Sequence, residues 1–305
     1  RVAIVVGLSL RAGMMEGVKD RLLRAITSDG CYRIVVCRTD RLVADASRRH
    51  ACSPLAARAL ARALTATALF ATTDKGYYRI GVQWMGRGPL RSIHTDARPG
   101  GILRGYVGDP SSEGADIAKA LGGGLIAVIR QDQAGTFTQG TLPLSSGNVD
   151  EDLEGYLCRS EQIPSRLRVV MDCDAEGRPE QVAGVLVQPL PGGAGEALLG
   201  DRGGLSRELL ARSLRADQAP EELLEQVLPS EQVNILSEEP LAFSCACNQD
   251  RVERGVAMLG RDELLEMIAE GQSAEVRCDF CGEDYVVPVE GLCKLVDELE
   301  ESRGN

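Results

Sequence analysis

Four cysteines near the C-terminal end of the chain stand in two close pairs. Cys245 and Cys247 form a C-x-C, thirty residues follow, and Cys278 and Cys281 form a C-x-x-C. Tetrahedral zinc takes four soft ligands at about 2.3 Å, and two short chelating turns supply two ligands each, whatever the length of chain between them. The two histidines of the chain are far away in sequence. The pattern therefore predicts one Zn²⁺ ion held by four cysteines.

The geometry of the same pairs also allows a second chemical state. Residues two apart on an extended strand sit near the upper limit of Cα separation for a disulfide, and a local bend brings them within range. A β-turn keeps the ends of C-x-x-C within roughly 7 Å. Metal binding holds the sulfurs as thiolates, and thiolates are the species that oxidants attack. The cluster can thus be interpreted as a metal site and as a redox sensor together.

Charge is distributed unevenly along the chain. Residues 196–305 carry 25 acidic and 10 basic side chains, whereas residues 1–195 carry 20 acidic and 24 basic ones, which gives net charges of −15 and +4. Nucleic-acid binding rests on clustered Lys and Arg, so the acidic C-terminal third argues against a nucleic-acid partner. We likewise expect no membrane association, because the most apolar stretch, Leu55 to Thr73, carries two arginines and is typical of a soluble helix.

The cysteine content favours a reducing, intracellular compartment. Secreted disulfide scaffolds are usually short and dense in cysteine, whereas the ten cysteines of this long chain are mostly scattered. Residues 1–15 are apolar, hold two arginines and no acid, and resemble an added tag or the remnant of a transit segment. We expect a cytoplasmic protein, with the plastid stroma or the mitochondrial matrix as the alternative.

Local patterns divide the rest of the chain into segments. Ser53-Pro54 is a typical helix start, because serine caps the free amides and proline at the first helical position loses no hydrogen bond. The other expected elements, in chain order, are a helix over 16–27, a strand over 31–38 with a hairpin partner over 41–48, strands through 77–170 interrupted by a helix near 152–157, a strand over 184–190 and a boundary at 191–195.

The segment from Leu205 to Leu236 is acidic, has helical spacing and shows no strand signal. A second helix is expected to open at Pro220 and to end at Pro229. With few large apolar residues, this region must lean on a neighbour or be marginally stable. The last part of the chain places the paired cysteines around a helical insert, RDELLEMIAEG, whose Gly271 suits a C-terminal cap.

These residues resemble a known family. The run FSCACNQDRVERGVAMLGRDELLEMIAEGQSAEVRCDFCGEDYVV closely resembles the zinc-binding redox-switch domain of the heat shock protein 33 family of redox-regulated chaperones. The likeness continues in GRGPL at 86–90, RGYV at 104–107, YLCRSEQIPSRL at 156–167 and GVLVQPLPG at 184–192. It covers about residues 16–292.

The resemblance implies an α+β protein in three parts. These are an N-terminal α/β domain with a twisted sheet packed by helices over 16–195, a metastable helical linker over 196–240 and a small zinc-binding redox-switch domain over 241–305. The family's zinc ligands fall on Cys245, Cys247, Cys278 and Cys281. In such proteins the reduced, zinc-bound form is inactive, and oxidation forms the disulfides Cys245–Cys247 and Cys278–Cys281 and releases zinc.

The resemblance also implies that the active form binds unfolding proteins without ATP. The switch domain and linker unfold on oxidation, apolar surface is exposed, and activated forms tend to dimerise. Candidate surfaces for such client proteins are newly exposed sheet in the first domain and the apolar linker residues Leu205, Leu209, Leu210 and Leu214.

Six further cysteines depart from the family pattern: Cys31, Cys37, Cys52, Cys158, Cys173 and Cys293. We expect them to be buried structural residues. Cys293 lies twelve residues beyond Cys281 and is the one expected to compete in disulfide exchange.

Two other functions fit part of the pattern. One is a zinc-ribbon nucleic-acid binder, although residues 245–281 hold eight acids against four arginines. The other is a thiol–disulfide oxidoreductase using the CDFC segment, although such enzymes place C-x-x-C at the start of a helix. No nucleotide-binding glycine motif is present, and His50 and His94 form no catalytic set that the sequence reveals, so we expect no enzyme activity.

Overall fold

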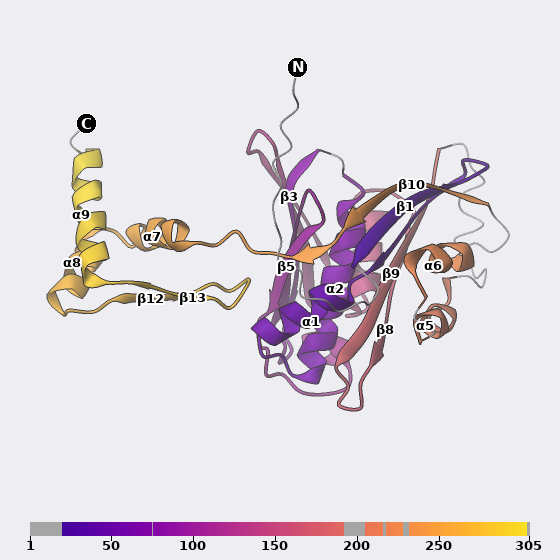
Figure 1. Ribbon diagram of the computed structural model, residues 1–305, viewed down its shortest axis with the longest axis horizontal. Coiled ribbons are helices and arrows are strands. Elements are labelled where there is room, and N and C mark those ends of the chain that lie inside the picture. The colour runs from indigo at the N-terminus through magenta and orange to yellow at the C-terminus, as the bar shows by residue number, and fades with distance from the viewer. Residues whose placement is uncertain (1–19, 75, 192–204, 216–217, 228–231, 304–305) are drawn as a thin grey trace, which may run out of the picture.

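The computed structural model describes residues 20–74, 76–191, 205–215, 218–227 and 232–303, and shows two β-sheets with a helix between them (Figure 1). Sheet A is antiparallel and, within these residues, has the strand order β10-β1-β2-β9-β8. Its strands are β1 (Arg21–Thr27), β2 (Tyr32–Arg38), β8 (Arg166–Cys173), β9 (Pro179–Pro189) and β10 (Val233–Pro240).

Sheet B has the strand order β11-β5-β4-β3-β6-β7 in the same described ranges. All its pairs are antiparallel except β11 with β5. Its strands are β3 (Tyr77–Gly86), β4 (Ser92–Arg98), β5 (Ile102–Val107), β6 (Gly124–Asp132), β7 (Phe137–Pro143) and β11 (Ala242–Phe243). Since β11 follows directly after β10, the chain crosses from sheet A to sheet B just before the first cysteine pair.

Helix α2 (Pro54–Ala71) fills the space between the two sheets. Ser53 accepts a hydrogen bond from the amide of Ala56, as a helix cap does. Small residues let the helix approach both sheets closely: a Cβ at Gly184 of sheet A would lie 2.7 Å from Thr65, and one at Gly105 of sheet B would lie 3.1 Å from Leu64. None of the described helices is long and apolar enough to cross a membrane.

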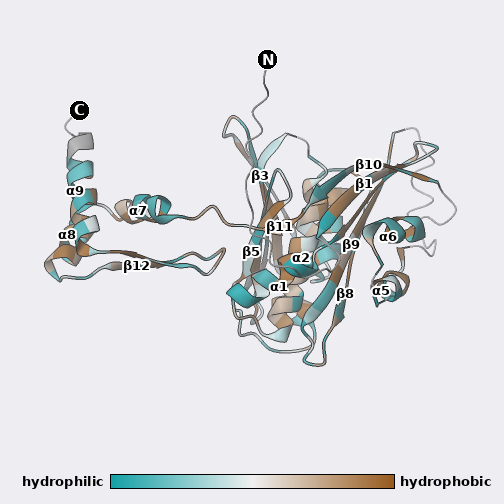
Figure 2. Ribbon diagram, in the orientation of Figure 1, coloured by the Kyte–Doolittle hydropathy of each residue, from teal (hydrophilic) through white to brown (hydrophobic). Residues whose placement is uncertain are grey.

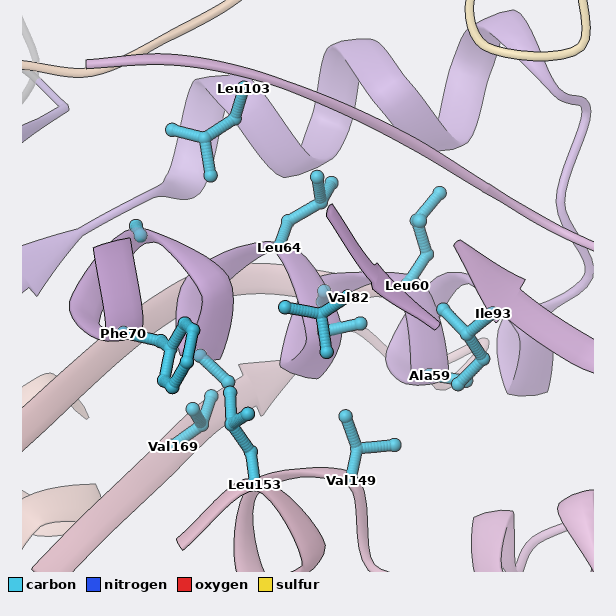
Figure 3. Close-up of a cluster of buried hydrophobic side chains, with 14 of the residues drawn as sticks. Ala59, Leu60, Leu64, Phe70, Val82, Ile93, Leu103, Val149, Leu153 and Val169 are labelled. Atoms are coloured by element: carbon cyan, nitrogen blue, oxygen red, sulfur yellow. The ribbon is translucent and has the colours of Figure 1, made fainter. Parts of the chain in front are cut away.

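The main core joins both sheets through this helix. Figure 3 shows Leu60 and Leu64 of α2 among side chains from sheet B, and Phe70 beside Val169 of sheet A. The remaining helices of this part are α1 (Asp40–Arg49), α3 (Ile117–Leu121) and α4 (Val149–Arg159). Figure 2 shows α1 as a largely hydrophilic ribbon, in contrast to the apolar strand β9.

Two linker helices, α5 (Arg207–Arg215) and α6 (Pro220–Val227), cover the other face of sheet A. Alternation along β2 divides its side chains between the two faces: Val35 packs toward α2, whereas Ile34 and Val36 pack toward the linker helices. The apolar residues of α5 and α6 therefore complete a second core with the sheet. This agrees with the prediction that the segment leans on a neighbour.

The C-terminal unit, residues 244–303, stands apart from the two sheets except at one end (Figure 1). It consists of α7 (Gln249–Ala257), α8 (Arg261–Ala269), the hairpin of β12 (Ala274–Arg277) with β13 (Asp284–Val287), and α9 (Val289–Arg303). Its core is small and comprises Val252, Val256, Leu264, Ala274, Val287, Leu292, Leu295 and Val296. Gly271 follows α8 at φ 67°, as the expected cap requires.

Three predicted elements are wrong. Residues 21–27 are strand β1 rather than part of a helix, because pairing with β2 and β10 on both edges outweighs the helical spacing. Residues 41–48 belong to α1 rather than to a hairpin, and Leu42, Val43 and Ala46 form its buried helical face. Residues 233–236 lie in β10, so the linker segment is helical only in part.

The expected strands between 77 and 170 are confirmed as β3 to β8, and the helix near 152–157 is α4. Residues 1–15 and most of the boundary at 191–195 lie outside the described residues.

Candidate metal centre

The four paired cysteines come together at the junction between sheet B and the C-terminal unit. Cys245 and Cys247 lie between β11 and α7, and Cys278 and Cys281 lie in the turn of the β12–β13 hairpin. All four Sγ atoms lie within 4.8 Å of one another. The Sγ atoms of Cys245 and Cys278 are 3.8 Å apart, and those of Cys247 and Cys281 are 3.1 Å apart.

Local structure explains how each pair is presented. The amide of Cys278 donates to the carbonyl of Glu283, and the amide of Gly282 donates to the carbonyl of Cys278, which closes the hairpin turn. Gly282 has φ 71°, a conformation that glycine adopts without strain. After Cys247, Asn248 caps α7 by accepting a hydrogen bond from the amide of Arg251. Each pair is thus held by a short, internally bonded segment.

The size and chemistry of the cluster fit a tetrahedral metal ion. Four thiolates at about 2.3 Å from a zinc ion would lie about 3.8 Å from one another. The observed sulfur separations, from 3.1 Å to at most 4.8 Å, bracket this value, and the donor set is made of sulfur alone, as in structural zinc sites. The residues therefore fit Zn²⁺, which Cys245, Cys247, Cys278 and Cys281 would hold.

Neighbouring groups give the four sulfurs different electrostatic surroundings. Burial raises the pKa of Cys245, but the hydrogen bond from Arg104 and those from Cys247 outweigh it and bring this pKa to about 7. Burial raises the pKa of Cys278 and of Cys281. The Tyr285 hydroxyl donates to Cys247 Sγ at 3.0 Å, and this bond raises the tyrosine pKa. Without a metal, Cys245 is the readiest of these three cysteines to ionise.

Comparison with known proteins identifies the family of the chain. The family model described as Hsp33 protein matches residues 20–288. The chain belongs to the Hsp33 family. It is 37% identical over 292 residues to the 33 kDa chaperonin of Geobacter sulfurreducens, covering 92% of this chain and 96% of that one. It is 36% identical over 304 residues to the 33 kDa chaperonin of Acaryochloris marina, covering 93% and 99%.

A solved Hsp33 structure has the same fold. The crystal structure of the 33 kDa chaperonin of Thermotoga maritima, a heat shock protein 33 homologue, superposes with a TM-score of 0.79. The match covers 93% of this chain and 99% of that one, at 27% sequence identity. The resemblance found in the sequence is therefore confirmed, and so is the mixed α/β architecture that it implied.

The four linker leucines proposed for client binding are not a free surface in this Hsp33 chain. Leu210 and Leu214 are completely buried against sheet A, and Leu205 and Leu209 are half-buried. A role in binding other proteins would require α5 to leave the sheet.

The six further cysteines lie outside the cluster and differ in exposure. Cys37 and Cys52 are buried, as expected, and burial raises the pKa of Cys52 to about 11. Cys31, Cys158 and Cys173 are half-buried. Cys293 on α9 is exposed, so the expectation of a buried structural residue is wrong there.

Two residues at the site were missed in the sequence. Arg104 Nη1 donates to Cys245 Sγ at 3.2 Å across 141 positions, and Tyr285 reaches Cys247 from β13. Arg104 belongs to the RGYV segment that carries part of the family likeness, but no spacing rule connects a strand of sheet B with the cysteines. Only the fold brings them together.

Proposed function

We propose that this Hsp33 chain is a redox-regulated, ATP-independent holdase chaperone, inactive when reduced and zinc-bound and active when oxidised. The observation that carries the proposal is the placement of the cysteine cluster. All four sulfurs gather at the only described junction between a small C-terminal unit and the two-sheet core, one strand away from the linker. A change at the cluster would therefore act on the linker as well.

A bound Zn²⁺ would supply a cross-link between the two cysteine pairs. Val287 and Leu292 are among the few buried residues of the C-terminal unit, and we expect a core of this size to need the metal for stability. Four thiolate ligands would hold the unit folded, and in this state the linker helices remain on sheet A.

Oxidation would convert each cysteine pair to a disulfide. One thiolate attacks hydrogen peroxide, the O–O bond breaks, and a sulfenic acid and hydroxide form. The second thiolate then displaces a further hydroxide as the S–S bond forms. Two electrons pass from the pair to the peroxide, and with two protons the products are two waters. Neutral disulfide sulfurs are poor ligands, so the site could no longer hold the ion.

We propose the pairing Cys245–Cys247 and Cys278–Cys281. In the folded cluster, sulfur separation does not select a pairing, because contacts between the pairs are as short as 3.1 Å. Once the C-terminal unit opens, only partners within a short loop stay close, and loop closure favours them. The disulfides within each pair are therefore the ones expected to survive.

Unfolding of the C-terminal unit would loosen the linker through β11 and β10. Release of α5 and α6 would expose Leu210 and Leu214, and with them the side chains of sheet A that they cover, such as Leu23 and Ile34. Together with Leu205 and Leu209 these residues form our proposed client surface. Two such surfaces could also bind each other, and we propose that the oxidised form dimerises.

The other candidate functions receive less support. The CDFC segment lies in a hairpin turn between two antiparallel strands, whereas oxidoreductases place C-x-x-C at a helix start. The hairpin also carries Glu283 and Asp284, which disfavour a phosphate backbone. We therefore propose neither enzymatic activity nor nucleic-acid binding. We also propose that the protein binds no membrane and is cytoplasmic, with the plastid stroma or the mitochondrial matrix as the alternative.

The decisive test follows zinc, thiols and activity in one sample. Reduced, zinc-loaded protein is treated with hydrogen peroxide at mildly raised temperature, and a chromophoric chelator reports the released ion. We expect loss of about one zinc and four thiols per chain, together with the onset of suppression of aggregation of a heat-unfolded client.

A quadruple serine variant of the four ligands should lose this peroxide-dependent onset. Cys173→Ser is the matched control, because Cys173 is half-buried in sheet A and outside the cluster. Normal activation of the quadruple variant by peroxide would contradict the proposed function.

A further inference from the structure

One arginine of sheet B connects the cysteine cluster to the core. Arg104 donates from Nη1 to Cys245 Sγ at 3.2 Å, and its guanidinium carbon lies 3.9 Å from the ring centroid of Phe280. Phe280 is the residue before Cys281 in the hairpin turn. Arg104 thus contacts both cysteine segments, one through a sulfur and the other through an aromatic ring.

The core holds this guanidinium in place. Arg104 Nε and Nη2 both donate to Asp96 Oδ2, at 2.9 and 2.6 Å, and the two residues are direct partners on neighbouring strands. The other oxygen of Asp96 pairs with Arg79 at 2.8 Å. With its carboxylate buried and shared by two arginines, Asp96 fixes Arg104 with one N–H directed at Cys245.

Further contacts surround Phe280 on the core side. The ring of Tyr106 meets the Phe280 ring edge-on at a centroid distance of 5.2 Å, and His94 stacks on Tyr106 at 4.7 Å. A ring nitrogen of His50 lies 3.2 Å from the carbonyl oxygen of Phe280. The middle of the CDFC turn is therefore seated against sheet B and the end of α1.

We propose that Arg104 is a positioning residue that docks the C-terminal unit on sheet B only while the cysteines are reduced. This inference rests on the proposed redox function. A metal-bound Cys245 is a thiolate and accepts a charge-assisted hydrogen bond from the guanidinium. In a Cys245–Cys247 disulfide the sulfur is neutral and a weak acceptor. A Cys278–Cys281 disulfide reshapes the turn that holds Phe280. Oxidation thus removes both contacts of Arg104 with the C-terminal unit, and only its pair with Asp96 remains.

Docking and metal binding are thermodynamically coupled, so the Arg104 contact has a measurable consequence in the reduced protein. If docking favours the metal-bound state, the same contact must raise the affinity for the metal by the same factor. Hydrogen-bond partners of metal ligands typically change metal affinity by about 10- to 100-fold. Arg104→Met should therefore weaken zinc binding about tenfold in competition with a chromophoric chelator. Asp96 keeps Arg79 as its partner in this variant, so the core should fold.

The second readout is hydrogen–deuterium exchange of the full-length, reduced, zinc-loaded protein. In Arg104→Met, amides of 242–248 and 278–283 should exchange roughly tenfold faster, as expected for the loss of a charge-assisted hydrogen bond. Amides of β4 and β5 should exchange at the wild-type rate. A general loss of stability would instead accelerate their exchange as well. Phe280→Ala should give the same pattern without altering sheet B.

Arg277→Met is the matched control. Arg277 is next to Cys278 but forms its ion pair with Asp284, at 3.5 Å, and its side chain is 63% exposed, so zinc affinity and exchange should stay as in the wild type. Unchanged zinc affinity and exchange in Arg104→Met would overturn the proposal, as would equal effects of Arg104→Met and Arg277→Met. Both measurements are made before any oxidant is added. They test the role of Arg104 separately from the proposed redox function, because the Arg104 result can be negative while peroxide activation is observed, or positive while it is not.

Discussion

Arg207 of linker helix α5 lies 2.9 Å from the carboxylate of Asp150, which is completely buried at the start of α4. Arg207 also donates to the carbonyl of Val169 and to Glu151, each at 2.9 Å. Burial raises the pKa of Asp150, but the charges of Arg62 and Arg207 outweigh it, so this pKa lies below its ordinary value. The linker is thus held on the core by an ion pair with a buried carboxylate, which Arg207 shares with Arg62 of the core.

Arg207→Met should release α5 from sheet A in the reduced protein. Asp150 would keep Arg62 at 3.2 Å, so we expect a loss of about 1.5–3 kcal/mol in the local stability of the linker, the usual range for a hydrogen bond to a charged group. Limited proteolysis within 207–227 should accelerate, and client binding should appear at lower peroxide. Arg215→Met is the control, since Arg215 is 55% exposed and 4.0 Å from Asp172. Equal proteolysis of the two variants would contradict this role of Arg207.

Leu214→Ala should loosen the same helix through packing. Leu214 is completely buried between α5 and sheet A, and truncation of such a leucine costs about 2–5 kcal/mol. Leu209→Ala, at a half-buried position on the same helix, should cost clearly less. Urea unfolding followed by a linker-specific exchange measurement compares the two, and similar losses would mean that α5 is not anchored by its apolar face.

Much of the site could be predicted from the sequence because its signals are local. The spacing of Cys245 to Cys247 and of Cys278 to Cys281 is a property of two short segments, and the Ser53-Pro54 cap acts within one turn. The contacts of Arg104 are different. They depend on the pairing of Arg104 with Asp96 across β4 and β5 and on the parallel addition of β11, which no short-range pattern encodes.

Long-range strand pairing also explains why residues 21–27 and 233–236 were assigned wrongly from the sequence. Strand β1 lies between β2 and β10 and has buried residues on both faces, so its apolar residues lack the alternation of a half-buried strand and imitate a helical spacing. Strand β10 is an edge strand with exposed residues such as Ile235 and Leu236, and its pairing partner lies about two hundred positions earlier. Tertiary pairing decided both elements.

Removal of the metal under reducing conditions should unfold the C-terminal unit and spare the two-sheet core. The buried apolar residues of this unit are few, and several of them, such as Val252 and Val256, are slightly exposed. A strong chelator should therefore abolish the helical signal of α7 to α9, seen as reduced far-ultraviolet circular dichroism, and leave a separate core transition in calorimetry. Retention of full helicity without metal would show that the unit folds alone.

Asp20 should make the stability of the core fall as pH rises. Its carboxylate accepts hydrogen bonds from the amides of Arg41 and Leu42, yet burial dominates and raises its pKa from 3.8 to about 6. The folded protein therefore binds this proton more tightly than the unfolded chain does. The contribution is fully present below pH 4 and is lost as pH rises through 6, a change of about 3 kcal/mol.

Asp20→Asn isolates this contribution from the other carboxylates. The variant lacks the titrating group, so its stability relative to the wild type should increase between pH 4 and pH 7. Urea midpoints of both proteins at several pH values measure the difference. Parallel profiles would mean that Asp20 does not titrate in this range.

Cys293→Ser should remove disulfide-linked dimers without affecting the two proposed disulfides. Cys293 is exposed on α9, and Cys281, twelve positions earlier in the chain, becomes reactive when the C-terminal unit opens, so the Cys293 thiol can attack either pair or a second chain. Cys37, by contrast, is completely buried, and burial raises its pKa, which keeps it reduced. Non-reducing gels and peptide mapping after peroxide should therefore find Cys245–Cys247 and Cys278–Cys281 in both proteins, and cross-linked chains only where Cys293 is present. A map in which Cys293 is joined mainly to Cys278 or Cys281 would contradict this pairing.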